Sequence, residues 1–339
     1  MEMCKCANEM RQPRHSMSFH LHIYIFPTFT YFKQNQMNHP LWGIDLGGTK
    51  IEGVILKSEN EPVPLVRTRV DTESDRGYDH VLGQIEKLVS KMRSESGLNP
   101  AGIGFGTPGI LDPSTQKLKN SNTVVLNNQP LKKDLEKRLQ LPVLLANDAN
   151  CFALAETTWG GVKKKAPQAR MVFGIILGTG VGGGIVIDGK IWEGHHGIGG
   201  EWGHNFLDES GGPCYCGKSG CVEKVISGPA LQKYYEELTG AKKTLPEIAE
   251  LAREDASAKK TLDRLAHFFG KAVSVVTNIL DPDIIVVGGG VGNIAGIYTD
   301  GVNALNQFIF NNYCSVPVIR PELGDSAGVF GAAALTNKM

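Results

Sequence analysis

The stretch LWGIDLGGTKIEGVIL, residues 41–56, predicts a strand, a glycine-rich turn and a second strand. The same arrangement returns in MVFGIILGTGVGGGIVIDGKI, residues 171–191, which carries five glycines between positions 178 and 184. After each hairpin, further strand patterns alternate with helical ones. We therefore predict an internally duplicated α/β chain with a mostly parallel or mixed sheet in each half.

Apolar spacing along the rest of the chain places the other elements. Buried strands are predicted at residues 102–106, 142–146 and 284–287. Helices are predicted at residues 84–94, 131–139, 229–239, 245–253, 259–280 and 325–335. One more helix follows the strand at 142–146, and we expect Asp148 to cap it and the helix to end near Thr157.

Composition and charge narrow the class of protein. The chain has 339 residues, of which 41% are hydrophobic and 21% charged, as in ordinary globular proteins with one large or two smaller domains. Lys+Arg and Asp+Glu are balanced at 35 each. Because no excess of positive charge is available to attract phosphate backbones or anionic lipids, we expect neither nucleic acid nor a membrane as partner.

Residues 1–36 have a different character from the rest. Residues 18–32 are aromatic-rich but interrupted by Pro27, too short to span a membrane, and not followed by a signal-peptide cleavage site. We interpret residues 1–36 as a disordered extension or a start assigned too far upstream, with a targeting segment as the alternative. Regular strand patterning begins after Met37, so removal of residues 1–36 is expected to leave folding and activity intact.

Three cysteines and one histidine lie within eighteen residues, at His204, Cys214, Cys216 and Cys221. Three sulfurs and one nitrogen match the tetrahedral preference of Zn²⁺, and a site closed by four protein ligands is usually structural. Thiolate ligands suit a reducing compartment, so we expect a cytoplasmic protein. The zinc would fix a loop that brings Glu201 and Glu223 to a site for a polar ligand.

The first glycine turn is a candidate phosphate-binding loop. Gly47 and Gly48 let backbone N–H groups approach an anion, Thr49 and Lys50 add donors, and Asp45 can hold Mg²⁺. No Walker A sequence occurs in the chain. The alternative interpretation is a tight hairpin turn without a ligand.

A second candidate loop stands at the equivalent place of the later hairpin. It contains Gly178, Thr179, Gly180 and Gly182. Two such loops in equivalent positions favour a clamp on a polyphosphate. Gly288 and Gly289 follow a buried strand, where an adenosine could lie against bare backbone, or where the glycines could serve helix packing. Gly104–Gly109 matches a dinucleotide fingerprint formally, but Pro108 and its successors do not open a helix, so a nicotinamide dehydrogenase is disfavoured.

Asn147 and Asp148 follow a buried strand directly. A helix cap is the common use of such residues. The alternative is a carboxylate facing a crevice at the strand's end, where Asp148 could accept a hydroxyl proton as general base while Asn147 orients the same substrate.

Taken together, the ordered motifs DLGGTK, NDAN, LGTGVGGG, GEWGH, CYCGKSGCVE and DPDIIVVGGG resemble the ROK family, from about Leu41 to the C-terminus. The resemblance implies an actin-like, hexokinase-type two-domain ATPase fold. The small domain would comprise residues 37–146 and about 322–339, and the large domain residues 147–321 with the zinc loop. It further implies ATP- and Mg²⁺-dependent phosphorylation of a hexose, usually at the 6-hydroxyl, by a homodimer.

The resemblance also suggests roles for individual residues. Asp148 is implied to be the catalytic base, and the stretches 45–50 and 178–182 to be the phosphate loops. The implied sugar contacts are Gly109, Asn122, Asn147, Asp148, Glu201, His204 and Glu223.

The sugar itself is left open between two groups. Residues 119–130 resemble the fructokinase- and mannokinase-type members, although Val125 and Asn128 depart from their pattern. N-acetylhexosamine kinases share NDANCFAL and the zinc loop. We expect an unmodified hexose (fructose, mannose or glucose) to be preferred, with an N-acetylhexosamine as the alternative. A sugar-responsive ROK repressor is disfavoured because residues 1–36 lack a two-helix DNA-binding pattern and the DLGGTK loop is intact.

Overall fold

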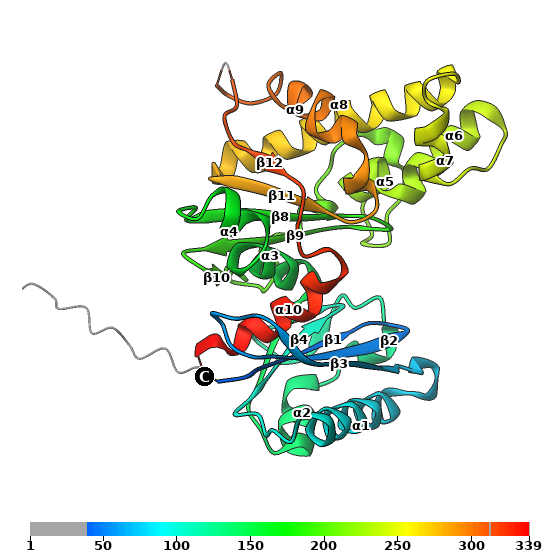
Figure 1. Ribbon diagram of the computed structural model, residues 1–339. Helices are drawn as coiled ribbons and strands as arrows, with labels where there is room; N and C mark the ends of the chain where they lie inside the picture. Colours follow the sequence, from blue (N-terminus) through cyan, green and yellow to red (C-terminus); the bar gives the residue numbers. More distant parts are fainter. Residues whose placement is uncertain (1–38, 312, 339) are drawn as a thin grey trace, which may run out of the picture. The chain divides into compact units, whose positions relative to one another are not determined.

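Two five-stranded sheets organise the part of the chain that the structure describes (Figure 1). The structure is a computed structural model and describes residues 39–311 and 313–338. The expectation for residues 1–36 therefore lies outside the described residues. Within those that are described, no helix combines the length and the apolar character needed to cross a membrane.

The first sheet has the strand order β3-β2-β1-β4-β7. Its strands are β1 (Leu41–Leu46), β2 (Lys50–Leu56), β3 (Pro64–Asp71), β4 (Ile103–Thr107) and β7 (Val143–Asn147). The three strands β1, β2 and β3 run antiparallel, whereas β4 pairs in parallel with β1 and β7. Helices α1 (Tyr78–Ser96) and α2 (Leu131–Leu139) cover one face and bury an apolar cluster there. A small hairpin, β5 (Ile110–Leu111) with β6 (Leu118–Lys119), is not part of this sheet, but β5 lies beside β7.

The second sheet repeats this plan with the order β10-β9-β8-β11-β12. Its strands are β8 (Met171–Leu177), β9 (Val181–Ile187), β10 (Lys190–Ile191), β11 (Ile284–Gly288) and β12 (Val318–Ile319). Again three antiparallel strands are followed by two parallel pairings. The predicted duplication of the α/β chain is therefore confirmed. The associated helices are α5 (Val222–Ile226), α6 (Gly228–Thr239), α7 (Leu245–Leu251), α8 (Ala256–Leu280) and α9 (Asp300–Leu305).

Two helices connect the sheets by exchanging places. Helix α3 (Asp148–Thr158) follows β7 of the first sheet but packs on β8 and β9 of the second. Helix α10 (Ala327–Ala334) follows β12 of the second sheet but packs on β1 and β4 of the first. The two helices also contact one another, and a Cβ at Gly331 would overlap the Cys151 carbonyl. Their apolar side chains form a core shared by both sheets.

A buried carboxylate fixes the chain between β12 and α10. Glu156, near the end of α3, is fully buried and accepts hydrogen bonds from the backbone N–H groups of Glu322 and Leu323. It also accepts one from the N–H of Gly161, at the start of the short helix α4 (Gly161–Lys165). Since a buried charge requires such partners, Glu156 holds three segments together at the crossing of the two sheets.

Candidate active site

The floor of the candidate site is formed where three parallel strands of the first sheet end. Strands β1, β4 and β7 are neighbours, and their carboxyl ends carry Asp45, Thr107 and Asn147. Asp148 begins α3 immediately beyond β7. Asp45 and Asp148 thus lie at the same edge of the first sheet. Ligands of α/β folds commonly bind at this edge, where the parallel strands end.

The helix cap at this edge differs from our expectation. Asn147, not Asp148, caps α3, since its Oδ1 accepts a hydrogen bond of 2.8 Å from the N–H of Asn150. The Asp148 carboxyl accepts the N–H of Ala149, at 2.8 Å to Oδ1, and its own backbone N–H also lowers its pKa. The expected cap was therefore wrong by one residue.

Both acids of the floor lie in surroundings that disfavour their charge. The Asp148 side chain is reachable by water, yet protein atoms surround it, and this desolvation raises the pKa of its carboxyl despite the N–H of Ala149. Burial, followed by the charges of Asp148 and Glu52, raises the pKa of Asp45 to about 6, while Lys50 opposes the shift. Carboxyls that influence each other in this way typify sites for cations or for proton transfer.

The wall of the candidate site comes from the second sheet's side. Glu201 precedes a short turn of 3-10 helix at Trp202–His204, and Glu223 lies in the first turn of α5. Burial is the main cause that raises the pKa of Glu201; the charges of Asp148 and Glu223 act in the same direction, while His204 lowers it. Glu201 therefore lies close enough to Asp148 and Glu223 for their charges to act on its carboxyl.

Glu223 also fixes the second glycine turn. Its Oε2 accepts the N–H of Val181 at 3.1 Å, and a Cβ at Gly180 would lie only 2.7 Å from this oxygen. In addition, the N–H of Gly228, at the start of α6, donates to the carbonyl of Gly178 at 2.8 Å. The absence of a side chain at Gly180 thus has a direct reason, because it admits the carboxylate that holds the turn.

The first glycine turn is held by different partners. The hydroxyl of Thr72 donates to the carbonyl of Gly47 at 2.7 Å, and the N–H of Gly47 donates to the carbonyl of Lys50 at 3.0 Å. Gly48, Thr49 and Lys50 are exposed. These three residues therefore remain accessible to a ligand such as the polyphosphate that the sequence suggested.

The other predicted nucleotide contacts lie beside the second turn. A Cβ at Gly178 would lie 3.8 Å from the N–H nitrogen of Gly290, so the stretch after β11 and the second turn are neighbours. Gly289 has a φ of 85° and approaches the carbonyl of Leu177. A Cβ at Gly288 would lie 2.7 Å from the Phe152 ring, and one at Gly182 would lie 3.2 Å from Ala149. Gly182 and Gly288 thus also serve packing against α3.

The predicted metal ligands form one cluster. The ligand atoms of His204, Cys214, Cys216 and Cys221 all lie within 4.8 Å of one another. The sulfurs of Cys216 and Cys221 are 3.6 Å apart, and Nδ1 of His204 is 3.7 Å from the Cys214 sulfur. Two sulfurs bound tetrahedrally at ~2.3 Å from Zn²⁺ are about 3.8 Å apart, so the donor set and its spacing fit zinc.

Tyr215 completes the surroundings of this cluster and escaped the sequence analysis. Its hydroxyl lies 2.9 Å from Nε2 of His204, on the opposite side of the ring from the thiols. A partner on Nε2 leaves Nδ1 to the metal, and zinc-bound histidines commonly have a hydrogen-bond partner on the nitrogen that does not bind the metal. Only its position between two ligand cysteines could have pointed to it in the sequence.

The two remaining sugar-contact candidates lie near the β5–β6 hairpin. Gly109 is buried, and a Cβ there would lie 2.7 Å from the carbonyl of Lys119. Asn122 is exposed, and its Oδ1 accepts a 3.4 Å hydrogen bond from the hydroxyl of Thr123. That hydroxyl also lies 3.1 Å from where a Cβ of Gly48 would be, so this segment borders the first glycine turn.

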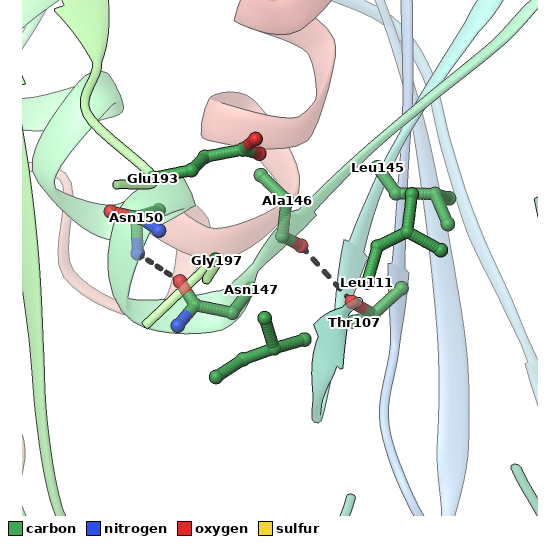
Figure 2. A pocket seen from close by; sticks show the side chains of 9 residues that line it. Thr107, Leu111, Leu145, Ala146, Asn147, Asn150, Glu193 and Gly197 are labelled. Carbon is green, nitrogen blue, oxygen red and sulfur yellow. Dashed lines mark hydrogen bonds between the residues drawn. The ribbon is translucent and has the colours of Figure 1, made fainter. Parts of the chain in front are cut away.

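A pocket opens beside Asn147, and Figure 2 shows the side chains around it. It is lined by Thr107, Ile110, Leu111, Leu145, Ala146, Asn147, Asn150, Glu193 and Gly197. Asn150 is 3% exposed, and its Oδ1 has no hydrogen-bond partner within the described part of the chain. Burial raises the pKa of Glu193, which Lys132 opposes. Sequence reasoning assigned no role to Asn150, although it ends the NDAN motif, and it missed Glu193, which belongs to no motif.

Comparisons with known proteins cover nearly the entire described chain. The sequence pattern of the ROK family matches residues 41–339. The N-acetyl-D-glucosamine kinase of Aliivibrio salmonicida is 34% identical over 308 residues, which cover 88% of this chain and 99% of that protein.

Two solved structures are similar over the same length. The ROK hexokinase of Thermus thermophilus has a TM-score of 0.77 and 30% identity, covering 87% of this chain and 97% of its own. A ROK family glucokinase from Streptomyces griseus, in complex with glucose and AMPPNP, has a TM-score of 0.71 and 28% identity. That match covers 88% of this chain and 100% of the glucokinase.

Proposed function

This chain belongs to the ROK family and is an ATP-dependent sugar kinase, and we propose that its substrate is N-acetyl-D-glucosamine, phosphorylated at the 6-hydroxyl. Its two sheets form the actin-like, hexokinase-type fold. The observation that carries the choice of sugar is the 34% identity to an N-acetyl-D-glucosamine kinase that this chain covers almost completely. Unmodified hexoses, ranked first from the sequence, thus become the alternative.

In the proposed reaction Asp148 acts as the general base. Its carboxylate accepts the proton of the sugar 6-hydroxyl while the hydroxyl oxygen forms a bond to the γ-phosphorus. The bond from that phosphorus to the bridging oxygen breaks, and ADP leaves. The raised pKa of Asp148 suits this role, because a general base works best with a pKa closer to neutral pH than an ordinary aspartate has.

Phosphate charge is handled by the two glycine turns. The accessible N–H groups of Gly48 and Thr49, together with the Lys50 ammonium, would bind phosphate oxygens from the first sheet's side, and Thr179 from the second. Mg²⁺, when bound, neutralises charge on the phosphates, and Asp45 is the residue that would hold it, since its carboxyl lies beside Asp148 in poorly solvated surroundings.

Sugar positioning is assigned to the wall and to Asn147. Glu201 and Glu223 would accept hydrogen bonds from hydroxyls, and the capped Asn147 would present its NH₂ group to another. Zinc, held by His204 and the three cysteines, would keep the segment that carries both glutamates in place and takes no part in the chemistry.

The test is a coupled ADP-release assay across N-acetylglucosamine, N-acetylmannosamine, glucose, mannose and fructose. We expect the highest kcat/KM for N-acetylglucosamine and no turnover with its 6-deoxy analogue, which lacks the accepting hydroxyl. A higher kcat/KM for any unmodified hexose would contradict the proposed substrate while leaving the kinase activity intact.

A further inference from the structure

The pocket beside Asn147 continues directly from the proposed sugar site on each of its sides. Ile110 adjoins Gly109, Asn150 lies one helical turn from Asn147, and Gly197 belongs to the loop that leads to Glu201. One proposed sugar contact, Asn147, therefore lines the pocket, and a second, Gly109, directly precedes a lining residue. A sugar held by those contacts would have one substituent directed toward this pocket.

One side of the pocket is bounded by the contact between the β5–β6 hairpin and the loop that contains Gly197. A Cβ at Gly197, whose φ is 72°, would lie 2.9 Å from the carbonyl of Leu111 and 3.0 Å from Ile110. The Lys119 ammonium, which pairs with Asp112 at 2.7 Å, also donates to the carbonyl of His196 at 3.2 Å. The β5–β6 hairpin and the loop before Glu201 are thus joined, and they enclose the space between them.

Its lining combines an apolar and a polar part. Ile110, Leu111 and Leu145 offer aliphatic surface, whereas Asn150 and Glu193 offer polar atoms (Figure 2). The Asn150 oxygen is buried without a partner, which is unfavourable unless a ligand or a water supplies a donor. The pocket therefore suits a small group that carries an N–H donor together with a methyl group.

We infer that this pocket receives the acetamido group of the sugar, with the acetamido N–H donating to Asn150 and the methyl lying against Ile110 and Leu111. The inference rests on the proposed function, which makes N-acetylglucosamine the substrate. An unmodified hexose carries a hydroxyl in place of the acetamido group at C2, and a hydroxyl has no methyl group to contact the aliphatic side chains. The pocket would thus determine specificity, while Asp148 performs the reaction on either kind of sugar.

The test compares kcat/KM for N-acetylglucosamine and glucose in two variants that alter different walls. Asn150→Leu keeps a similar volume but removes the acceptor, and it breaks no hydrogen bond at Oδ1. Leu111→Trp fills the space from the opposite side. In both variants we expect kcat/KM for N-acetylglucosamine to fall roughly tenfold or more and that for glucose to change less than about twofold. Leu238→Trp, on the exposed side of α6, is the control for an added indole.

Two further measurements, the Tm of the variants and the activity on a second N-acyl sugar, separate an effect on binding from an effect on folding. Because Asn150→Leu replaces an unpartnered buried oxygen, its Tm should equal or exceed that of the wild type, so weaker activity cannot be ascribed to unfolding. N-formylglucosamine lacks the methyl group, so the wild type should bind it more weakly than N-acetylglucosamine. Leu111→Trp should lower its kcat/KM less than it lowers that of N-acetylglucosamine.

The possible failures are distinguishable. Equal losses for both sugars, or no loss for either, in the two variants would overturn the acetamido pocket while a wild-type preference for N-acetylglucosamine preserves the proposed function. A wild type that prefers glucose would overturn the proposed function and this inference with it.

Discussion

The floor and the wall of the site present acids of the same kind on very different supports. Asp45 and Asp148 stand at the ends of strands β1 and β7, where sheet hydrogen bonds and the cap of α3 fix the backbone. Glu201 and Glu223 flank a segment with two isolated β-bridges and short 3-10 turns, where the thiol and imidazole cluster is the main anchor. We therefore expect that the side chains of the floor can be changed without moving its backbone, whereas the position of the wall would depend on a metal bound by the four ligands.

The largest expected effect tests the floor. Asp148→Asn keeps the shape of the side chain but cannot accept a proton, so kcat should fall by about 10²–10⁴ while sugar affinity changes little. The measurements are steady-state kinetics and calorimetric titration with the sugar. Asp263→Asn, which removes an exposed acid paired with Lys259 on α8, is the control. A near-normal kcat would show that Asp148 is not the base.

The second prediction tests the wall. Cys216→Ser should lower the zinc content from one per chain to near zero and weaken sugar binding by roughly 10–100-fold, because the support of Glu201 and Glu223 is lost. Elemental analysis and sugar titration measure the two effects, with Cys314→Ser, a cysteine outside the cluster, as control. Full sugar affinity in a zinc-free variant would mean that the wall stands without a metal.

The smallest expected effect concerns the stability of the floor. Asp45 has a pKa of about 6 in the folded chain and near 3.8 as an ordinary residue, so between these values the folded protein retains a proton that the unfolded chain has lost. Stability contributed by this group therefore falls as pH rises through that window and stays low above it. Asp45→Asn should be more stable than the wild type above pH 6, by about 1–2 kcal/mol after allowance for partial solvent screening.

Urea unfolding at a series of pH values, without nucleotide or Mg²⁺, measures this difference. It should shrink toward zero as the pH falls below about 3, where Asp45 is protonated in both states. Asp188→Asn, which removes an exposed carboxyl whose pKa Arg170 lowers, should show no such gain at neutral pH. A stability difference for Asp45→Asn that is independent of pH would place its origin in packing rather than in charge.

Features of the fold and site that are formed by residues close together in the sequence could be predicted. The two hairpins and the histidine–cysteine set lie within short stretches, and their spacing alone indicated strands, turns and a tetrahedral site. The cap of α3 was misplaced because Asn and Asp are about equally good at that position, so only the backbone could decide between neighbours.

Features assembled from distant segments were not accessible in this way. The aliphatic and polar walls of the pocket come from three parts of the chain, represented by Ile110, Asn150 and Glu193. The packing of Phe152 on Gly288 likewise depends on α3 crossing to the second sheet. The ranking of the sugars rested on residues 119–130, which favoured an unmodified hexose, whereas the relatives favour the alternative, an N-acetylhexosamine. The domain boundaries drawn at residues 146 and 321 remain a prediction.

The crossing of α3 and α10 has a consequence for the order in which the protein can be made. The first sheet emerges from the ribosome early, yet the helix that covers β1 and β4 consists of residues 327–334, near the end of the chain. Until those residues are synthesised, the buried side chains of Leu41, Val54 and Leu56 lack their cover. A nascent chain that lacks residues 327–334 would thus carry an apolar sheet face that invites aggregation or chaperone binding, and β1 can reach its final state only after α10 has been translated.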